Sequence, residues 1–237
     1  MDSMIATIIG VGFVLGLRHA LDPDHVVAVT TLASQRAGFR RTSLVGAFWG
    51  FGHALTLSVV GGAILAMRVA VPPAVSEALE AVVAVMLVVL GALALRRASR
   101  WQLHAHPHQH DGAMHVHFHA HAPGQVQVHH HPHPLAGGLR PFLVGCVHGL
   151  AGSAGLALLV LGAAPTVLAG VVYLAVFGLG SIGGMLLLSA VMSLPLGYLE
   201  TRYAAVHRAV QFAAGAASLG FGLFLLGHYA LAVIARG

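Results

Sequence analysis

The sequence has one cysteine and no lysine, and only 8% of its 237 residues are charged. The single cysteine, Cys146, excludes an internal disulfide framework and a cysteine-based zinc finger. Soluble domains carry about 25% charged residues, so this chain has too few to cover a soluble surface. Because 57% of the residues are hydrophobic and the mean hydropathy is +0.84, the composition predicts an integral membrane protein.

Without lysine, the formal net charge of +5 rests on arginine alone. In a membrane protein this charge reports topology, and we expect no nucleic-acid partner. An apolar run of about 20 residues crosses a bilayer as a helix. We expect six spans, at residues 4–33, 43–67, 75–95, 141–163, 166–194 and 209–234. The first run is long and carries a polar motif, so we expect a mature span rather than a cleaved signal.

Arginines are divided unevenly between the two sides of the predicted membrane. Nine lie in the connections after the first, third and fifth spans: Arg36, Arg40, Arg41, Arg96, Arg97, Arg100, Arg140, Arg202 and Arg208. Only Arg68 and Arg236 lie on the other side. Since cytoplasmic loops are enriched in positive residues, we expect those three connections in the cytoplasm and both termini outside.

Histidines and carboxylates gather in one short stretch of the first span, at His19, Asp22, Asp24 and His25. Ionisable groups inside a membrane span usually mark a function, and imidazole with carboxylate suits nickel, cobalt, zinc or iron. Pro23 removes a helix hydrogen bond, so we expect the helix to break there and bring the four side chains to one metal site. Asp24 is either a ligand or the group that orients a histidine. The alternative is a capping and salt-bridge cluster at a helix end.

Two pairs of short segments match in the same order, which indicates an internal repeat. Residues 13–21 and 142–150 share the pattern Phe-x-x-Gly-x-x-His-x-Leu, with His148 at the position of His19. Residues 49–53 and 177–181 share aromatic-Gly-x-Gly-polar, with Ser181 at the position of His53. Three spans per repeat would give the halves opposite orientations, as in many secondary transporters. His53 and His148 are therefore further metal-ligand candidates, with helix-to-helix hydrogen bonding or plain packing as the alternative.

Four other polar residues are weaker candidates. Ser153 and Ser181 could line a pathway beside the second repeat. We expect His207 and His228 to be structural rather than ligating.

A histidine-rich insert separates the two predicted halves. It holds twelve histidines: His104, His106, His108, His110, His115, His117, His119, His121, His129, His130, His131 and His133. Such low-complexity sequence has no core to fold around, which predicts a flexible cytoplasmic loop over residues 98–138 between membrane repeats at 1–97 and 139–237. Imidazoles on a tether chelate borderline divalent metals at neutral pH. We expect metal capture or buffering, and the alternative is a solvated linker.

The motifs resemble those of the nickel/cobalt transporter superfamily. Residues 18–25 resemble its His-x4-Asp-His signature, and Phe51-Gly52-His53-Ala54 resembles its second, Gly-His motif. The stretch around His148 is similar to the UreH-type urease-accessory membrane proteins, and the histidine-rich insert to the nickel/cobalt efflux branch. The resemblance implies permeation of Ni²⁺ or Co²⁺ along a route lined by the signature residues.

The sequence thus predicts an all-α polytopic membrane protein of six helices in two inverted repeats. Its function would be secondary transport of Ni²⁺ or Co²⁺, with the metal as substrate, no prosthetic group and no catalysis. Predicted partners are divalent metal ions and the lipid bilayer; a second copy of the chain or a metal-delivery protein would be further ones. One alternative is an intramembrane zinc hydrolase. The argument against it is that we expect no general-base glutamate near the site. The other is a metal-buffering scaffold in which only the insert matters.

Overall fold

The computed structural model describes residues 2–35, 38–69, 71–99, 102–110, 113–121, 138–151 and 166–234. Within these ranges the chain is helical apart from one β-hairpin. The elements are α1 (Asp2–His19), α2 (Pro23–Ala33), α3 (Phe39–Met67), α4 (Pro73–Ser99), β1 (Gln102–His110), β2 (Ala113–His121), a helix over residues 138–151, α6 (Val167–Arg202) and α7 (Ala204–Ile234).

Four helices are long and apolar enough to cross a membrane, at Phe39–Met67, Pro73–Ser99, Val167–Leu199 and Ala204–Ala232. They correspond to the second, third, fifth and sixth predicted spans. The first predicted span is divided into α1 and α2, and the fourth extends past residue 151 beyond the described residues. The chain is a multi-pass membrane protein.

The first helix breaks where the proline predicts. α1 ends at His19, and two short-range hydrogen bonds follow, from Leu21 N–H to the Arg18 carbonyl (2.8 Å) and from Asp22 N–H to the His19 carbonyl (3.1 Å). Pro23 is the first residue of α2, a position at which a missing N–H costs nothing. The break changes the direction of the chain within the motif and ends α1 on one histidine.

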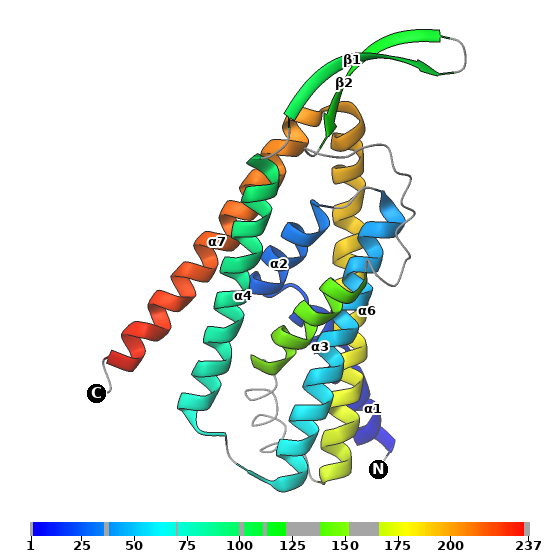
Figure 1. The fold of residues 1–237 in the computed structure, drawn as a ribbon. Helices are drawn as coiled ribbons and strands as arrows, with labels where there is room; N and C mark the ends of the chain where they lie inside the picture. Colours follow the sequence, from blue (N-terminus) through cyan, green and yellow to red (C-terminus); the bar gives the residue numbers. More distant parts are fainter. Residues whose placement is uncertain are drawn as a thin grey trace.

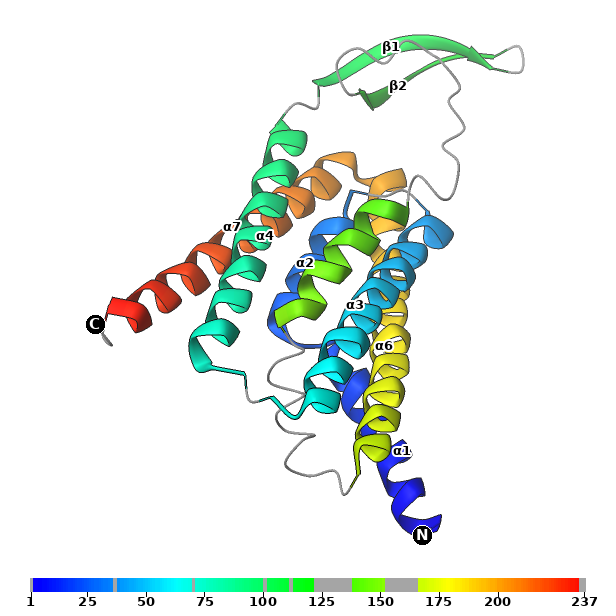
Figure 2. The ribbon, with the colours of Figure 1, turned by 60° about the horizontal axis from the view of Figure 1, so that its bottom comes forward.

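The helices form two pairs with shorter segments between them (Figures 1 and 2). One pair is α4 with α7, and the other is α3 with α6, against which α1 also packs. α2 and helix 138–151 lie between the pairs. Hydrogen bonds tie α7 to its neighbours: the Ala214 carbonyl accepts from Thr31 (3.1 Å) on α2, and the Leu87 carbonyl on α4 accepts from Ser218 (2.9 Å).

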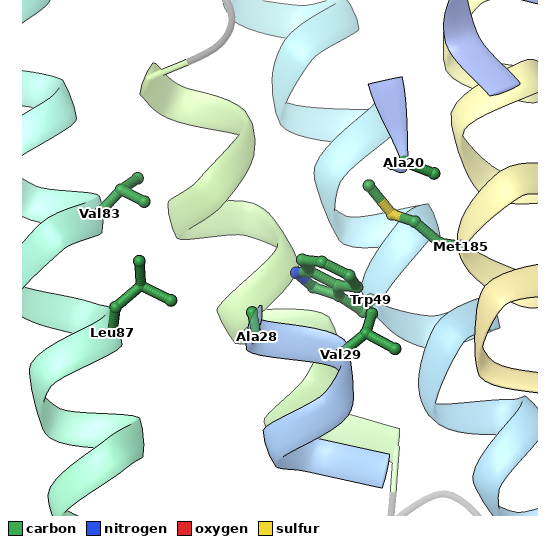
Figure 3. Packing of buried hydrophobic residues seen from close by; sticks show 7 residues of the cluster. All are labelled: Ala20, Ala28, Val29, Trp49, Val83, Leu87 and Met185. Carbon is green, nitrogen blue, oxygen red and sulfur yellow. The ribbon is translucent and has the colours of Figure 1, made fainter. Parts of the chain in front are cut away.

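Buried apolar side chains fill the centre between these helices (Figure 3). The cluster comprises Ala20, Ala28, Val29, Trp49, Val83, Leu87 and Met185. It draws on α2, α3, α4 and α6, so it joins the two helix pairs. Trp49 is completely buried, and a buried aromatic ring contributes a large share of apolar area.

Glycine allows α1 to approach α6 closely. A methyl group on Gly16 of α1 would overlap the Phe177 carbonyl oxygen of α6. A methyl group on Gly180 of α6 would likewise overlap the Phe13 carbonyl oxygen of α1. Small residues at such crossings let membrane helices pack backbone to backbone.

The same kind of contact joins α3 to helix 138–151. A methyl group on Gly145 would overlap the Trp49 carbonyl oxygen, and one on Gly52 would overlap the Phe142 carbonyl oxygen. This crossing brings together the helices that carry His53 and His148.

Part of the histidine-rich insert forms an antiparallel hairpin of β1 and β2. The strand register pairs His104 with His119, His106 with His117, and His108 with His115. A lone two-stranded hairpin is marginally stable in water, so this local order is compatible with the predicted flexible loop. His129, His130, His131 and His133 lie outside the described residues.

Candidate metal centre

Three histidines from three helical segments converge at the helix break. His19 ends α1, His25 lies in the first turn of α2, and His53 lies in the middle of α3. One nitrogen from each lies within 4.8 Å of the others. The Nε2 atoms of His19 and His53 are 3.2 Å apart. Metal–imidazole bonds of about 2.0–2.1 Å place two ligand nitrogens about 3.3 Å apart around a tetrahedral ion, so this spacing suits a shared metal.

Asp22 orients His19. Its carboxylate accepts a 2.7 Å hydrogen bond from His19 Nδ1, which fixes the imidazole with Nε2 toward the centre. Asp22 is the N-cap residue of α2 and makes no side-chain capping bond. Its side chain is 49% exposed and belongs to neither group of clustered ligand atoms. The structure therefore gives Asp22 a position that supports His19.

Asp24 joins two histidines. One oxygen, Oδ1, accepts from His25 Nδ1 (2.9 Å) and from the His25 backbone N–H (2.9 Å). The other, Oδ2, accepts from His148 Nε2 (2.7 Å), 124 residues along the chain. The rings of His25 and His148 lie 3.9 Å apart between centroids. These three residues form a second group of ligand atoms, and His25 belongs to both groups.

Three buried imidazole nitrogens are free to bind a metal, and two of them belong to histidines that Asp24 holds through the other ring nitrogen. A neutral imidazole that donates through one nitrogen has a lone pair on the other. His25 Nε2, His53 Nδ1 and His148 Nδ1 are buried and have no hydrogen-bond partner among the described residues. Metal-binding histidines are commonly held through the second nitrogen by a carboxylate. The arrangement at Asp24 fits that pattern, and the residues fit a divalent transition-metal ion.

The centre opens into a pocket of about 260 Å³. The lining includes His19, Asp24, His25, His53 and His148 together with Pro23, Glu80, Val83, Ala151, Phe221, Leu225 and Tyr229. Sequence reasoning missed Glu80 and Tyr229. Glu80 also corrects the expectation that no glutamate lies near the site. A signal was present, because a glutamate inside the predicted span 75–95 is an intramembrane ionisable residue.

The weaker candidates lie elsewhere. Ser181 is buried and donates to the Phe177 carbonyl of its own helix (3.0 Å). His207 is buried with Nε2 3.0 Å from Gln211 Nε2, and His228 is exposed on α7. None of these three lines the pocket. Ser153 lies outside the described residues.

Comparison with known proteins supports a specific relationship. No protein-family profile matches the chain, and no solved structure matches it. Over 230 residues the chain is 33% identical to the urease accessory protein UreH of Bacillus sp. (strain TB-90). The match covers 97% of this chain and 93% of that protein. The chain belongs to the UreH family of urease accessory proteins.

Proposed function

We propose that the protein carries Ni²⁺, and Co²⁺ by the same ligands, across the cell membrane through the centre at the α1–α2 break. The observation that carries this proposal is the convergence of His19, His25 and His53, one nitrogen of each within 4.8 Å of the others, with His19 and His25 held by the carboxylates of Asp22 and Asp24. Imidazole suits nickel and cobalt. The UreH relative is named for urease accessory function, which favours uptake of nickel for an enzyme over a catalytic role of the chain itself.

Ligand exchange provides the route. The ion would replace its water with imidazole nitrogen at His19, His25 and His53, while Asp24 and Asp22 hold two of these rings. His148, held by Asp24, presents Nδ1 from the helix on the other side of the site. Because the two groups of ligand atoms share His25, an ion could pass from one group to the other without losing all its protein ligands.

Two inverted three-helix repeats, residues 1–97 and 139–237, would supply the movement. Their support is a matched set of backbone contacts. Gly16 meets the carbonyl of Phe177, and its repeat counterpart Gly145 meets that of Trp49. Gly52 and its counterpart Gly180 meet the carbonyls of Phe142 and Phe13 in the same way. Inverted repeats that meet at broken helices are the plan of many secondary transporters. The remainder of the fourth predicted span, residues 152–163, lies outside the described residues.

The orientation follows the arginines, with the histidine-rich insert in the cytoplasm and both termini outside. The start of α1 and the end of α7 lie away from the hairpin (Figure 1), which agrees with that arrangement. The insert would bind metal beside the cytoplasmic end of the route. The register of β1 and β2 supports this, because residues directly opposite in a hairpin have Cβ atoms about 4.5–5.5 Å apart, and three such positions pair histidine with histidine.

A zinc hydrolase is the alternative with an observation of its own, since Glu80 lines the pocket together with four histidines. A hydrolase retains one tightly bound zinc through purification, whereas a transport site exchanges nickel or cobalt. Metal analysis of the purified protein, before and after incubation with Ni²⁺, separates the two.

The test of transport is Ni²⁺ and Co²⁺ flux into proteoliposomes. The intact chain is compared with His19→Ala and with a deletion of residues 104–133. We expect flux through the intact chain, loss of flux in His19→Ala, and retained flux with weaker metal accumulation in the deletion. His228→Ala is the matched control, because this exposed histidine lies outside the pocket.

Normal flux in His19→Ala would show that the centre is not the route. Flux abolished by the deletion alone would show that the histidine-rich insert is more than a buffer.

A further inference from the structure

The pocket has a second polar wall, formed by Glu80 of α4 and Tyr229 of α7. Both side chains line the pocket, and the Tyr229 hydroxyl lies beside the Glu80 carboxylate, to which it can donate. Neither residue belongs to the two groups of clustered ligand atoms. The pocket therefore has a carboxylate in the same lining as the histidines, on a pair of helices that contributes nothing else charged to that lining.

Glu80 lies inside a membrane-spanning helix. It is seven residues after Pro73, the first residue of α4, which is about 10 Å along the helix axis. Tyr229 is five residues before Ile234, the last residue of α7. Both positions belong to the ends of α4 and α7 that lie away from the hairpin (Figures 1 and 2). An ionisable residue at such a depth is costly and needs a partner or a task.

The other carboxylate of the pocket lining is already engaged. Both oxygens of Asp24 accept hydrogen bonds from imidazoles. Among the described residues, the side chain that interacts with Glu80 is that of Tyr229. An ionised carboxylate offers about four lone-pair sites, so Glu80 keeps capacity to bind a cation while it accepts from Tyr229.

We propose that Glu80 is a cation ligand of the pocket, which exchanges the divalent ion between the histidine centre and the membrane face on which the termini lie. The proposal rests on the transport function proposed above and adds a residue to its route. A hard oxygen ligand receives a hydrated ion readily, and the softer imidazoles then replace more of its water. Tyr229 is a positioning residue, because its hydroxyl competes with the ion for a Glu80 oxygen.

The experiment compares four variants in the full chain: Glu80→Gln, Tyr229→Phe, the double variant, and Glu77→Gln. Glu77→Gln is the control, because it removes the same charge from α4 one turn away and Glu77 does not line the pocket. Two readouts are used. They are the KM and kcat of Ni²⁺ flux in proteoliposomes, and equilibrium Ni²⁺ binding to the purified protein in detergent.

We expect Glu80→Gln to raise the KM for Ni²⁺ about tenfold or more, the size of one lost charged ligand contact. Tyr229→Phe should have the opposite effect and lower the KM for Ni²⁺ a few-fold, because the Tyr229 hydroxyl no longer occupies a Glu80 oxygen. The double variant should match Glu80→Gln, since Tyr229 acts only through Glu80. A purely structural role for Tyr229 predicts additive losses instead.

The two proposals fail in different ways. If the intact chain carries no Ni²⁺ but Glu80→Gln weakens Ni²⁺ binding and Glu77→Gln does not, transport is wrong and the Glu80 ligand stands. If flux is normal and Glu80→Gln matches the intact chain in KM and in binding, the Glu80 assignment is overturned and transport stands. Equal changes of KM and Ni²⁺ binding in Glu77→Gln and Glu80→Gln also overturn the Glu80 assignment. Such a result would mean that any negative charge near the pocket has the same effect.

Discussion

Two helix crossings beside the metal centre use the same backbone contact and carry different chemistry. At one, Gly16 of α1 meets the Phe177 carbonyl, and the next turn brings His19. At the other, Gly145 meets the Trp49 carbonyl, and the next turn brings His148. Beyond that point the two segments diverge, because Asp22 stands in the first and Ala151 in the second.

The difference shows which features each half supplies. Both halves provide the close packing that holds the pocket in shape. The first provides both carboxylates of the motif and three of the four clustered histidines. The second provides one histidine, which depends on Asp24 of the first for its orientation. The comparison therefore predicts that substitutions in either half alter the packing around the pocket. Metal binding should depend mainly on residues of the first half.

The largest effect is expected from His25→Ala. His25 is the histidine shared by the two groups of ligand atoms, and its Nε2 is buried without a partner. Its loss should weaken Ni²⁺ binding by more than the about 10–100-fold typical of changes to outer-shell partners. Equilibrium binding to the purified protein measures it. A binding constant within a few-fold of the intact chain would mean that the two groups do not form one centre.

The second-largest effect on Ni²⁺ binding is expected from Asp24→Asn. Its carboxylate holds His25 and His148, so we expect a loss of about 10–100-fold in Ni²⁺ affinity. Asp22→Asn is the comparison, because Asp22 holds only His19 and is half exposed. The smaller loss should belong to Asp22, and binding measured on both variants decides the order. The reverse order would show that Asp22, not Asp24, dominates the motif.

These residues also show how much of the site could be predicted from the sequence. The histidine–aspartate stretch, the break at Pro23 and the place of His148 in the pocket lining could be predicted, because local spacing and matching short patterns in the sequence point to them. The different contacts of Asp22 and Asp24 could not be predicted, because they depend on the direction that α2 takes after the break. Glu80 and Tyr229 were missed for a related reason: their meeting depends on the packing of α4 against α7, which no short motif records.

The shared packing is tested by Gly16→Ala and Gly145→Ala. Each added methyl group would overlap a carbonyl oxygen of the facing helix, and overpacking costs about 1–3 kcal/mol. We expect similar losses of thermal stability in detergent from the two variants. Gly62→Ala in α3 is the control, because a methyl group there meets no atom within 4 Å. If only one of the pair lowers stability beyond this control, the two crossings are not equivalent.

The smallest effect should come from adding to the second half the charge it lacks. Ala151 lines the pocket and is the counterpart of Asp22 in the repeat. Ala151→Asp therefore places a carboxylate beside the histidines. We expect Ni²⁺ binding to tighten a few-fold and flux at saturating metal to fall, since a transported ion must also leave its site. Ala151→Asn separates charge from size. Tighter Ni²⁺ binding in Ala151→Asp but not in Ala151→Asn would show that the second half forms part of the same centre and lacks only the ligand. Unchanged binding in both variants would confine the metal to the first half.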